Sequence, residues 1–140
     1  MSQHNPDYRR ERLFIDTFII RVKRDRYNSL MSNPQKRQKL LDRMNHNLDF
    51  DYSLAKQVEC YDLEKIEAKL ISLGATPENC YFISDSCELD QTTVSLKEGL
   101  KQAADFYFAS ILDCVAGKLA IYWDETYKTR RCFILLNASE

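Results

Sequence analysis

The stretches that decide the fold are KLAIYW at residues 118–123 and RCFILLN at residues 131–137. Each is typical of a β-strand, and in both of them the two sets of alternating positions are apolar. A sheet with one face in water alternates apolar and polar side chains instead. We therefore expect helices on one face of this sheet, and either helices or a second copy of the chain on the other.

The segment before these strands predicts the remaining sheet and two helices. Asp62 is a suitable N-cap for a helix that ends at Gly74, where a left-handed conformation closes the last turn. Ala116-Gly117 predicts a tight turn between two strands. The predicted elements are a helix over 63–73, a strand over 80–84, a helix over 96–106 and strands over 108–115, 118–123 and 131–137.

The N-terminal segment predicts two further helices. Phe14, Phe18 and Val22 recur every four residues, which favours one helix over 8–31, although the β-branched run at 13–20 would also suit a strand. Asn33-Pro34 ends this helix and starts another over 34–47. Residues 48–62 show a less regular spacing of apolar residues and are predicted to be a connecting loop with a short helical turn.

The predicted fold class is therefore α+β. An N-terminal basic helical pair and a third helix pack on a small, mainly antiparallel sheet, in the order helices then β-α-β-β-β. The length of 140 residues suits a single globular domain over 1–140.

Charge divides this chain into two parts. Residues 1–47 carry 11 Lys and Arg against 5 Asp and Glu, a net charge of +6, whereas residues 48–140 carry 9 against 16, a net charge of −7. We call 1–47 the basic helical arm and 48–140 the acidic body. Such a polarised surface is suited to steering a charged partner.

The arm holds the residues that we expect to bind a partner. They form a basic patch made of Arg21, Arg24, Arg26, Lys36, Arg37, Lys39 and Arg43. Cations at this density could neutralise the phosphates of a nucleic acid. However, the sequence pI of about 6.1 is low for a nucleic-acid-binding domain, and the chain has no zinc-finger or RNA-binding motif. A protein partner is therefore preferred.

A metal site is a weaker possibility at the end of the second helix. His46, Asp49 and Asp51 offer nitrogen and oxygen ligands, but the set is incomplete. A histidine at the negative end of a helix dipole explains the pattern more simply. We expect no metal and no cofactor.

Acidic loops and one cysteine are the candidates for catalysis. Loops 85–90 and 124–125 each bring carboxylates together, although turns and cross-strand ion pairs with Lys128, Arg130 and Arg131 explain them more simply. Asp113 falls on a strand face beside apolar residues, so we expect it to be buried and paired with Arg131 or Lys118. Cys114 alternates with it and is expected to be a core thiol.

The cysteine pattern and the N-terminus favour a cytoplasmic location. The five cysteines show no CxxC pair, the first residues carry no apolar leader, and no apolar run is long enough to span a bilayer. We expect five free thiols and no membrane contact.

The leading functional hypothesis is a small cytosolic, non-enzymatic protein that binds another macromolecule. A protein partner fits best, with the chain acting as a regulator, adaptor or inhibitor, or associating with itself. The alternative is nucleic-acid binding through the basic helices of residues 9–43. A second alternative is an enzyme that uses the acidic residues of loop 85–90 or 124–125.

Overall fold

The computed structural model describes residues 4–46, 49–106, 108–124 and 130–138. Within these residues it contains five α-helices and one six-stranded sheet, which confirms the α+β fold class. The helices are α1 (Tyr8–Phe18), α2 (Arg24–Met31), α3 (Arg37–His46), α4 (Leu63–Ser72) and α5 (Leu96–Asp105). The strands are β1 (Ala55–Val58), β2 (Cys80–Ser84), β3 (Thr93–Val94), β4 (Ser110–Val115), β5 (Leu119–Trp123) and β6 (Cys132–Leu136).

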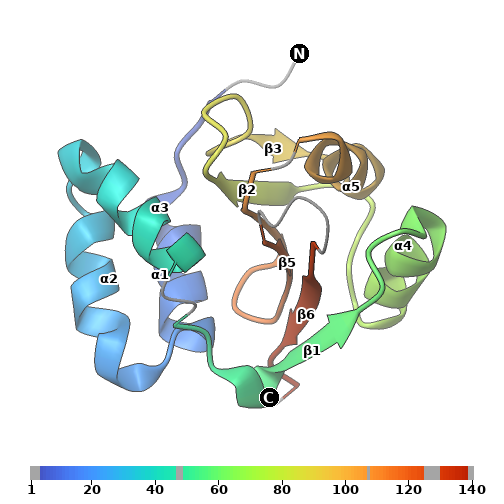
Figure 1. Ribbon diagram of the computed structural model, residues 1–140, viewed down its shortest axis with the longest axis horizontal. Helices are drawn as coiled ribbons and strands as arrows, with labels where there is room; N and C mark the ends of the chain where they lie inside the picture. The colour runs from blue at the N-terminus through green and yellow to red at the C-terminus, as the bar shows by residue number, and fades with distance from the viewer. Residues whose placement is uncertain (1–3, 47–48, 107, 125–129, 139–140) are drawn as a thin grey trace.

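The sheet is antiparallel throughout, in the order β1-β6-β5-β4-β2-β3 (Figure 1). The hairpin of β4 and β5 turns at Gly117, whose φ of 72° is one that few residues with a Cβ adopt. The register of β5 and β6 places Tyr122 opposite Phe133 and Ile121 opposite Ile134. The two side chains of each pair therefore point to the same face of the sheet, as the alternation along the strands predicts.

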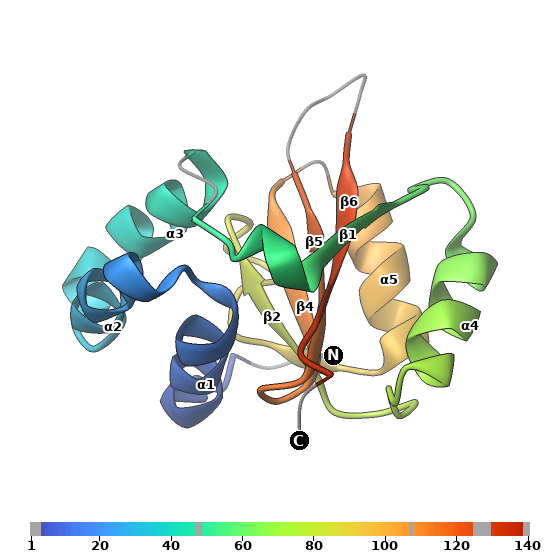
Figure 2. The same cartoon turned by 90° about the horizontal axis from the view of Figure 1, so that it is seen from below.

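Helices cover both faces of the sheet, as Figure 2 shows. Helices α1, α2 and α3 pack on one face, where Tyr122 and Leu135 join a core that includes Phe14 and Phe18. Helices α4 and α5 lie on the other, where Trp123 and Ile134 join the second core. The expected double cover is confirmed, and it is made by helices of the same chain.

The prediction of one continuous helix over 8–31 is wrong, because the helix is interrupted after Phe18. Helix α1 ends at Phe18, and Ile19 is extended, with φ −84° and ψ 141°. The Ile20 amide donates to the carbonyl of Asp49 at 2.8 Å, and the Asp51 amide donates to that of Phe18 at 2.7 Å. The strand tendency of the β-branched run is thus satisfied at Ile19 and Ile20 by pairing with residues 49–51. A short 3₁₀ turn, η1 (Arg21–Lys23), then leads into α2.

The predicted loop over 48–62 hides an edge strand. The 3₁₀ turn η3 (Tyr52–Leu54) leads into β1, which pairs with β6. A second 3₁₀ turn, η2 (Pro34–Lys36), opens the segment predicted as the second helix, so that α3 begins at Arg37.

No helix in the described ranges has both the length and the apolar character that a membrane crossing needs.

Candidate functional site

Two of the arm's arginines turn inward and fasten it to the sheet. The Arg37 side chain is only 15% exposed. Its Nη1 donates to Glu11 Oε1 at 2.6 Å, while Nε and Nη2 donate to the two carboxylate oxygens of Asp90 at 2.7 and 2.9 Å. The bidentate contact with Asp90 joins α3 to the loop after β2, and the bond to Glu11 joins α3 to α1. Arg37, which the sequence analysis placed in the basic patch, thus makes three side-chain hydrogen bonds within the fold.

The carboxylate of Glu11 is the buried centre of this network. The Tyr81 hydroxyl donates to its Oε2 at 2.6 Å, and the same hydroxyl accepts from the Asp7 amide at 3.1 Å. Burial and the nearby Glu11 charge raise the pKa of Tyr81, which stays protonated and able to donate. Burial alone would lower the pKa of Arg37, but its bonds to Asp90 and Glu11 raise it. Arg37 therefore keeps its positive charge at neutral pH.

A second inward arginine pairs with the buried acid of β4. Arg10 Nε donates to Asp113 Oδ2 at 2.6 Å, and its Nη2 donates to the Asp113 carbonyl at 2.7 Å. The expectation that Asp113 pairs with Arg131 or Lys118 is wrong. Asp113 lies opposite Ala120 on β5, whereas Arg131 bonds Asp124, so the partner comes from a helix 103 residues away.

Arg24 and Arg43, two further members of the patch, are half-buried. Arg24 Nε donates to the Ile19 carbonyl at 2.8 Å, which stabilises the break after α1. Arg43 is half-buried near Tyr27, whose hydroxyl donates to Asp49 at 2.8 Å. Neither residue is as available for a partner as the sequence suggested.

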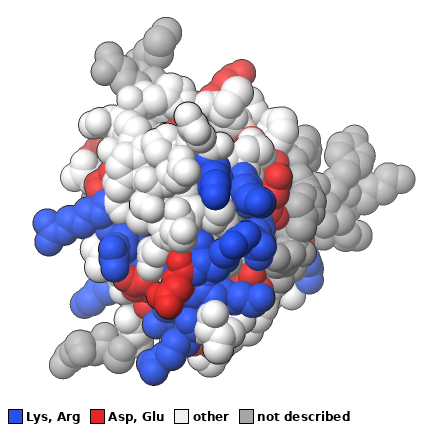
Figure 3. All heavy atoms as spheres, turned by 90° about the vertical axis from the view of Figure 1, so that its left-hand side faces the viewer, with Lys and Arg blue, Asp and Glu red and all other residues white. Residues whose placement is uncertain are grey.

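The remaining four patch residues are exposed cations. Arg21, Arg26, Lys36 and Lys39 face solvent, and no carboxylate of the described residues lies within 4.0 Å of their charged nitrogens. Figure 3 shows the blue of Lys and Arg spread over this face, with red acidic groups among it. The exposed acids Asp25 and Asp42 belong to α2 and α3 themselves. The basic patch is thus smaller and more mixed than its sequence predicts.

The metal candidates do not form a described centre. Asp49 accepts the Tyr27 hydroxyl, and Asp51 caps η3 by accepting from the Ser53 amide at 3.1 Å. The side chain of His46 lies outside the described residues. Among the residues that are described, no group of three or more His, Cys, Asp or Glu is placed to hold a metal ion.

The acidic loops are tied into the fold. In the first, Asp90 binds Arg37, Asp85 accepts from Gln38 at 3.0 Å, and Glu88 is exposed. In the second, Asp124 accepts from Arg131 at 2.8 Å, which confirms the predicted ion pair, whereas Glu125 and Lys128 lie outside the described residues. Asp85, Asp90 and Asp124 therefore each hold one part of the fold to another.

The thiols are unbonded and mostly shielded. All five cysteines are free, as predicted; Cys80, Cys114 and Cys132 are buried, and Cys87 is exposed. A hydrogen bond with Cys80 and burial raise the pKa of Cys114 well above its usual value. The raised pKa keeps the Cys114 thiol protonated, and the protonated form is the unreactive one. Cys114 is therefore a buried core residue, as its alternation predicts.

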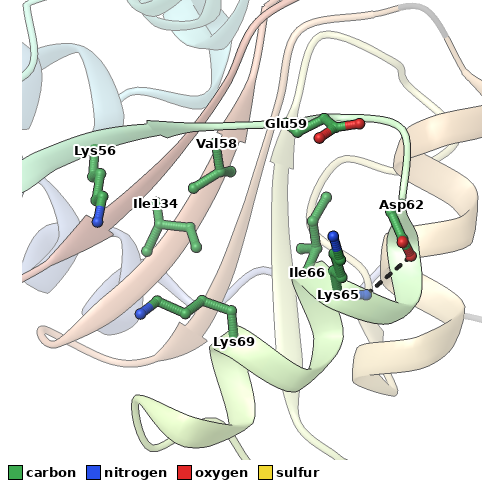
Figure 4. A pocket seen from close by; sticks show the side chains of 8 residues that line it. All are labelled: Lys56, Val58, Glu59, Asp62, Lys65, Ile66, Lys69 and Ile134. Carbon is green, nitrogen blue, oxygen red and sulfur yellow. Dashed lines mark hydrogen bonds between the residues drawn. The ribbon is translucent and has the colours of Figure 1, made fainter.

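A groove between α4 and the β1–β6 edge is the feature that the sequence did not reveal. Lys56 lies opposite Ile134, and Val58 lies opposite Cys132, so both β1 residues face the α4 side. One hollow of the groove, of about 310 Å³, is drawn in Figure 4. It is lined by Lys56, Val58, Glu59, Asp62, Lys65, Ile66, Lys69 and Ile134.

The groove continues along the whole of α4. A second hollow shares Lys56, Lys69 and Ile134 with the first and extends to Leu73 and Leu136. A third hollow is also lined by Leu73 and Leu136, and it extends to Lys118. The floor is apolar, and its exposed rim carries four lysines against the acids Glu59 and Asp62. The Asp62 carboxylate accepts from the Lys65 amide as the N-cap of α4 (Figure 4).

Comparison with known proteins adds no relative. The chain matches no family model, no curated protein and no solved structure.

We predict that Arg37→Ala lowers the free energy of unfolding by about 3 kcal/mol, because Glu11 and Asp90 lose their buried countercharge. Urea denaturation at neutral pH measures the change. The control is Arg26→Ala, an exposed arginine of α2, which should shift the same quantity by less than about 0.5 kcal/mol. Equal losses in the two variants would contradict a structural role for Arg37.

Asp113 predicts a specific pH dependence. Burial outweighs Arg10 and raises the pKa of Asp113 from 3.8 to about 6, and its Oδ1 has no hydrogen-bond partner among the described residues. Between pH 3.8 and about pH 6, Asp113 keeps its proton in the folded chain but has released it in the unfolded chain. The free energy of unfolding therefore falls as the pH rises through this range.

The wild-type protein should therefore lose about 2–3 kcal/mol relative to Asp113→Asn between pH ~4 and ~7, since each pKa unit is worth ~1.4 kcal/mol. Urea denaturation of both proteins across this range measures the difference. A wild type that gains stability over the variant as pH rises would show that the Arg10 pair dominates.

Proposed function

We propose that this protein acts by binding another protein, without chemistry of its own, as a regulator, adaptor or inhibitor. The observation that carries the proposal is the groove between α4 and the β1–β6 edge. It combines an apolar floor with exposed charged side chains at its rim, the composition that protein interfaces share. Its length, set by the ten residues of α4, is about 15 Å at the helical rise per residue.

The state of the acidic side chains supports binding over catalysis. Asp85, Asp90 and Asp124 each accept a hydrogen bond that holds an element in place. The free thiols support the proposal of a cytoplasmic location, because an oxidising compartment favours disulfides.

A site-specific crosslink inside the native cell tests this function. Glu59, which follows β1, and Glu98 on α5 are both exposed glutamates, but only Glu59 lines the groove. Each is replaced in turn by the photoreactive residue p-benzoylphenylalanine. We expect a discrete protein adduct from position 59 that survives nuclease treatment and is absent from position 98. Adducts at neither position, at both, or lost on nuclease treatment would contradict the proposal.

The second candidate function is nucleic-acid binding by the arm. It is favoured by one observation, the exposure of Arg21, Arg26, Lys36 and Lys39. The low pI and the interspersed acids Asp25 and Asp42 weigh against it.

A mobility-shift assay with duplex DNA and single-stranded RNA decides between the two. We expect no complex at physiological salt, because four scattered cations release few counterions on binding phosphates. The matched variant reverses Arg21, Arg26, Lys36 and Lys39 to glutamate and leaves the buried Arg37 intact. A complex that persists at physiological salt in the wild type and disappears in this variant would promote the second candidate.

A further inference from the structure

The rim of the groove gathers positive charge where the surrounding body is acidic. Residues 48–140 carry a net charge of −7, yet Lys56, Lys65, Lys69 and Lys118 all line the groove. No carboxylate of the described residues lies within 4.0 Å of these ammonium groups. In Figure 4, Lys56 reaches from β1 and Lys69 from α4 toward the space beside Ile134. Two like charges held at one apolar site are stabilised by an anion placed between them.

The floor accepts apolar side chains. Val58, Ile66 and Ile134 surround the first hollow, and Leu73 and Leu136 surround the second. Hollows that follow one another along α4 suit a row of side chains from one segment better than a single compact ligand.

We propose that the groove binds an acidic, amphipathic segment of a partner protein, with apolar side chains on the floor and carboxylates paired to Lys56, Lys65 and Lys69. The inference rests on the proposed function and specifies the chemistry of the partner. A groove of about 15 Å takes about three helical turns or about five extended residues. Charge complementarity selects the acidic segment, because a basic one would meet the lysine rim with like charge.

Selection from a random library of peptides of about 12 residues, displayed on phage, tests the inference without assuming a sequence. We expect the wild-type protein to enrich peptides in which Asp or Glu alternate with Leu, Ile, Phe or Trp. The test variant is Lys65→Glu/Lys69→Glu on α4. The matched control is Lys97→Glu/Lys101→Glu, which reverses two exposed lysines with the same spacing on α5, outside the groove.

Fluorescence anisotropy of an enriched, labelled peptide gives the affinities. We expect the α4 variant to weaken binding at least tenfold, and the α5 variant to bind as the wild type does, although both carry the same change in net charge. Thermal unfolding followed by circular dichroism establishes that both variants remain folded.

Several outcomes would overturn the inference. They are enrichment of no peptide, enrichment of neutral or basic peptides, or equal binding by the two variants. If neutral peptides bind in the groove, the proposal of an acidic partner is wrong while the proposal of protein binding stands. If acidic peptides bind but position 59 crosslinks to no protein, the proposal of protein binding fails instead. A wild-type dimer in sedimentation that Lys65→Glu/Lys69→Glu dissociates would identify a second copy as the occupant.

Discussion

The rest of the structure depends on a sheet whose two faces are both apolar. Ile121 and Ile134 point to one side of the central strands, and Tyr122 and Leu135 to the other. Each large apolar side chain buried contributes about 1.5–3 kcal/mol, so neither face can stay in water without a large loss. The strands lie near the C-terminal end of the chain, and the helices that cover one face come from its beginning. The N-terminal arm is therefore a structural layer of this sheet and not an appendage.

Docking that arm explains part of the charge division along the chain. Arg10 meets Asp113 of β4, and Arg37 meets Asp90 after β2, so basic residues of the arm neutralise acids of the body. Buried charges of this kind stabilise little when made but cost much when one partner is removed, which fixes where the arm can lie. A sequence shows how many cations a helix carries. It does not show which of them meet an acid 53 or 103 residues away, and for that reason the predicted basic patch includes Arg37, whose guanidinium binds Asp90 in the folded chain.

Local signals predicted the elements that they govern. Alternating apolar residues located β4, β5 and β6, and the cap at Asp62 located the start of α4. The failures lie where distant pairing overrides local pattern. Ile19 leaves the helix to pair with Phe50, and β1, with exposed Lys56 and Gln57, forms a strand because the edge of β6 is available. The groove was beyond prediction for a related reason, since its walls come from segments that meet only in the folded chain.

The groove is itself a consequence of how the second helical layer is built. Helix α5 lies close against β4 because Gly99 has no Cβ, which would stand 2.9 Å from Leu112. Helix α4 packs chiefly against α5, which leaves the β6–β1 end of this face open along the rim. In the free protein the alkyl stems of Lys56 and Lys69 can shield the apolar floor while their ammonium groups stay hydrated. An acidic segment would replace those stems with its own apolar side chains and give the ammonium groups their counterions. This incompletely covered part of the sheet is thus also a place where the body offers positive charge.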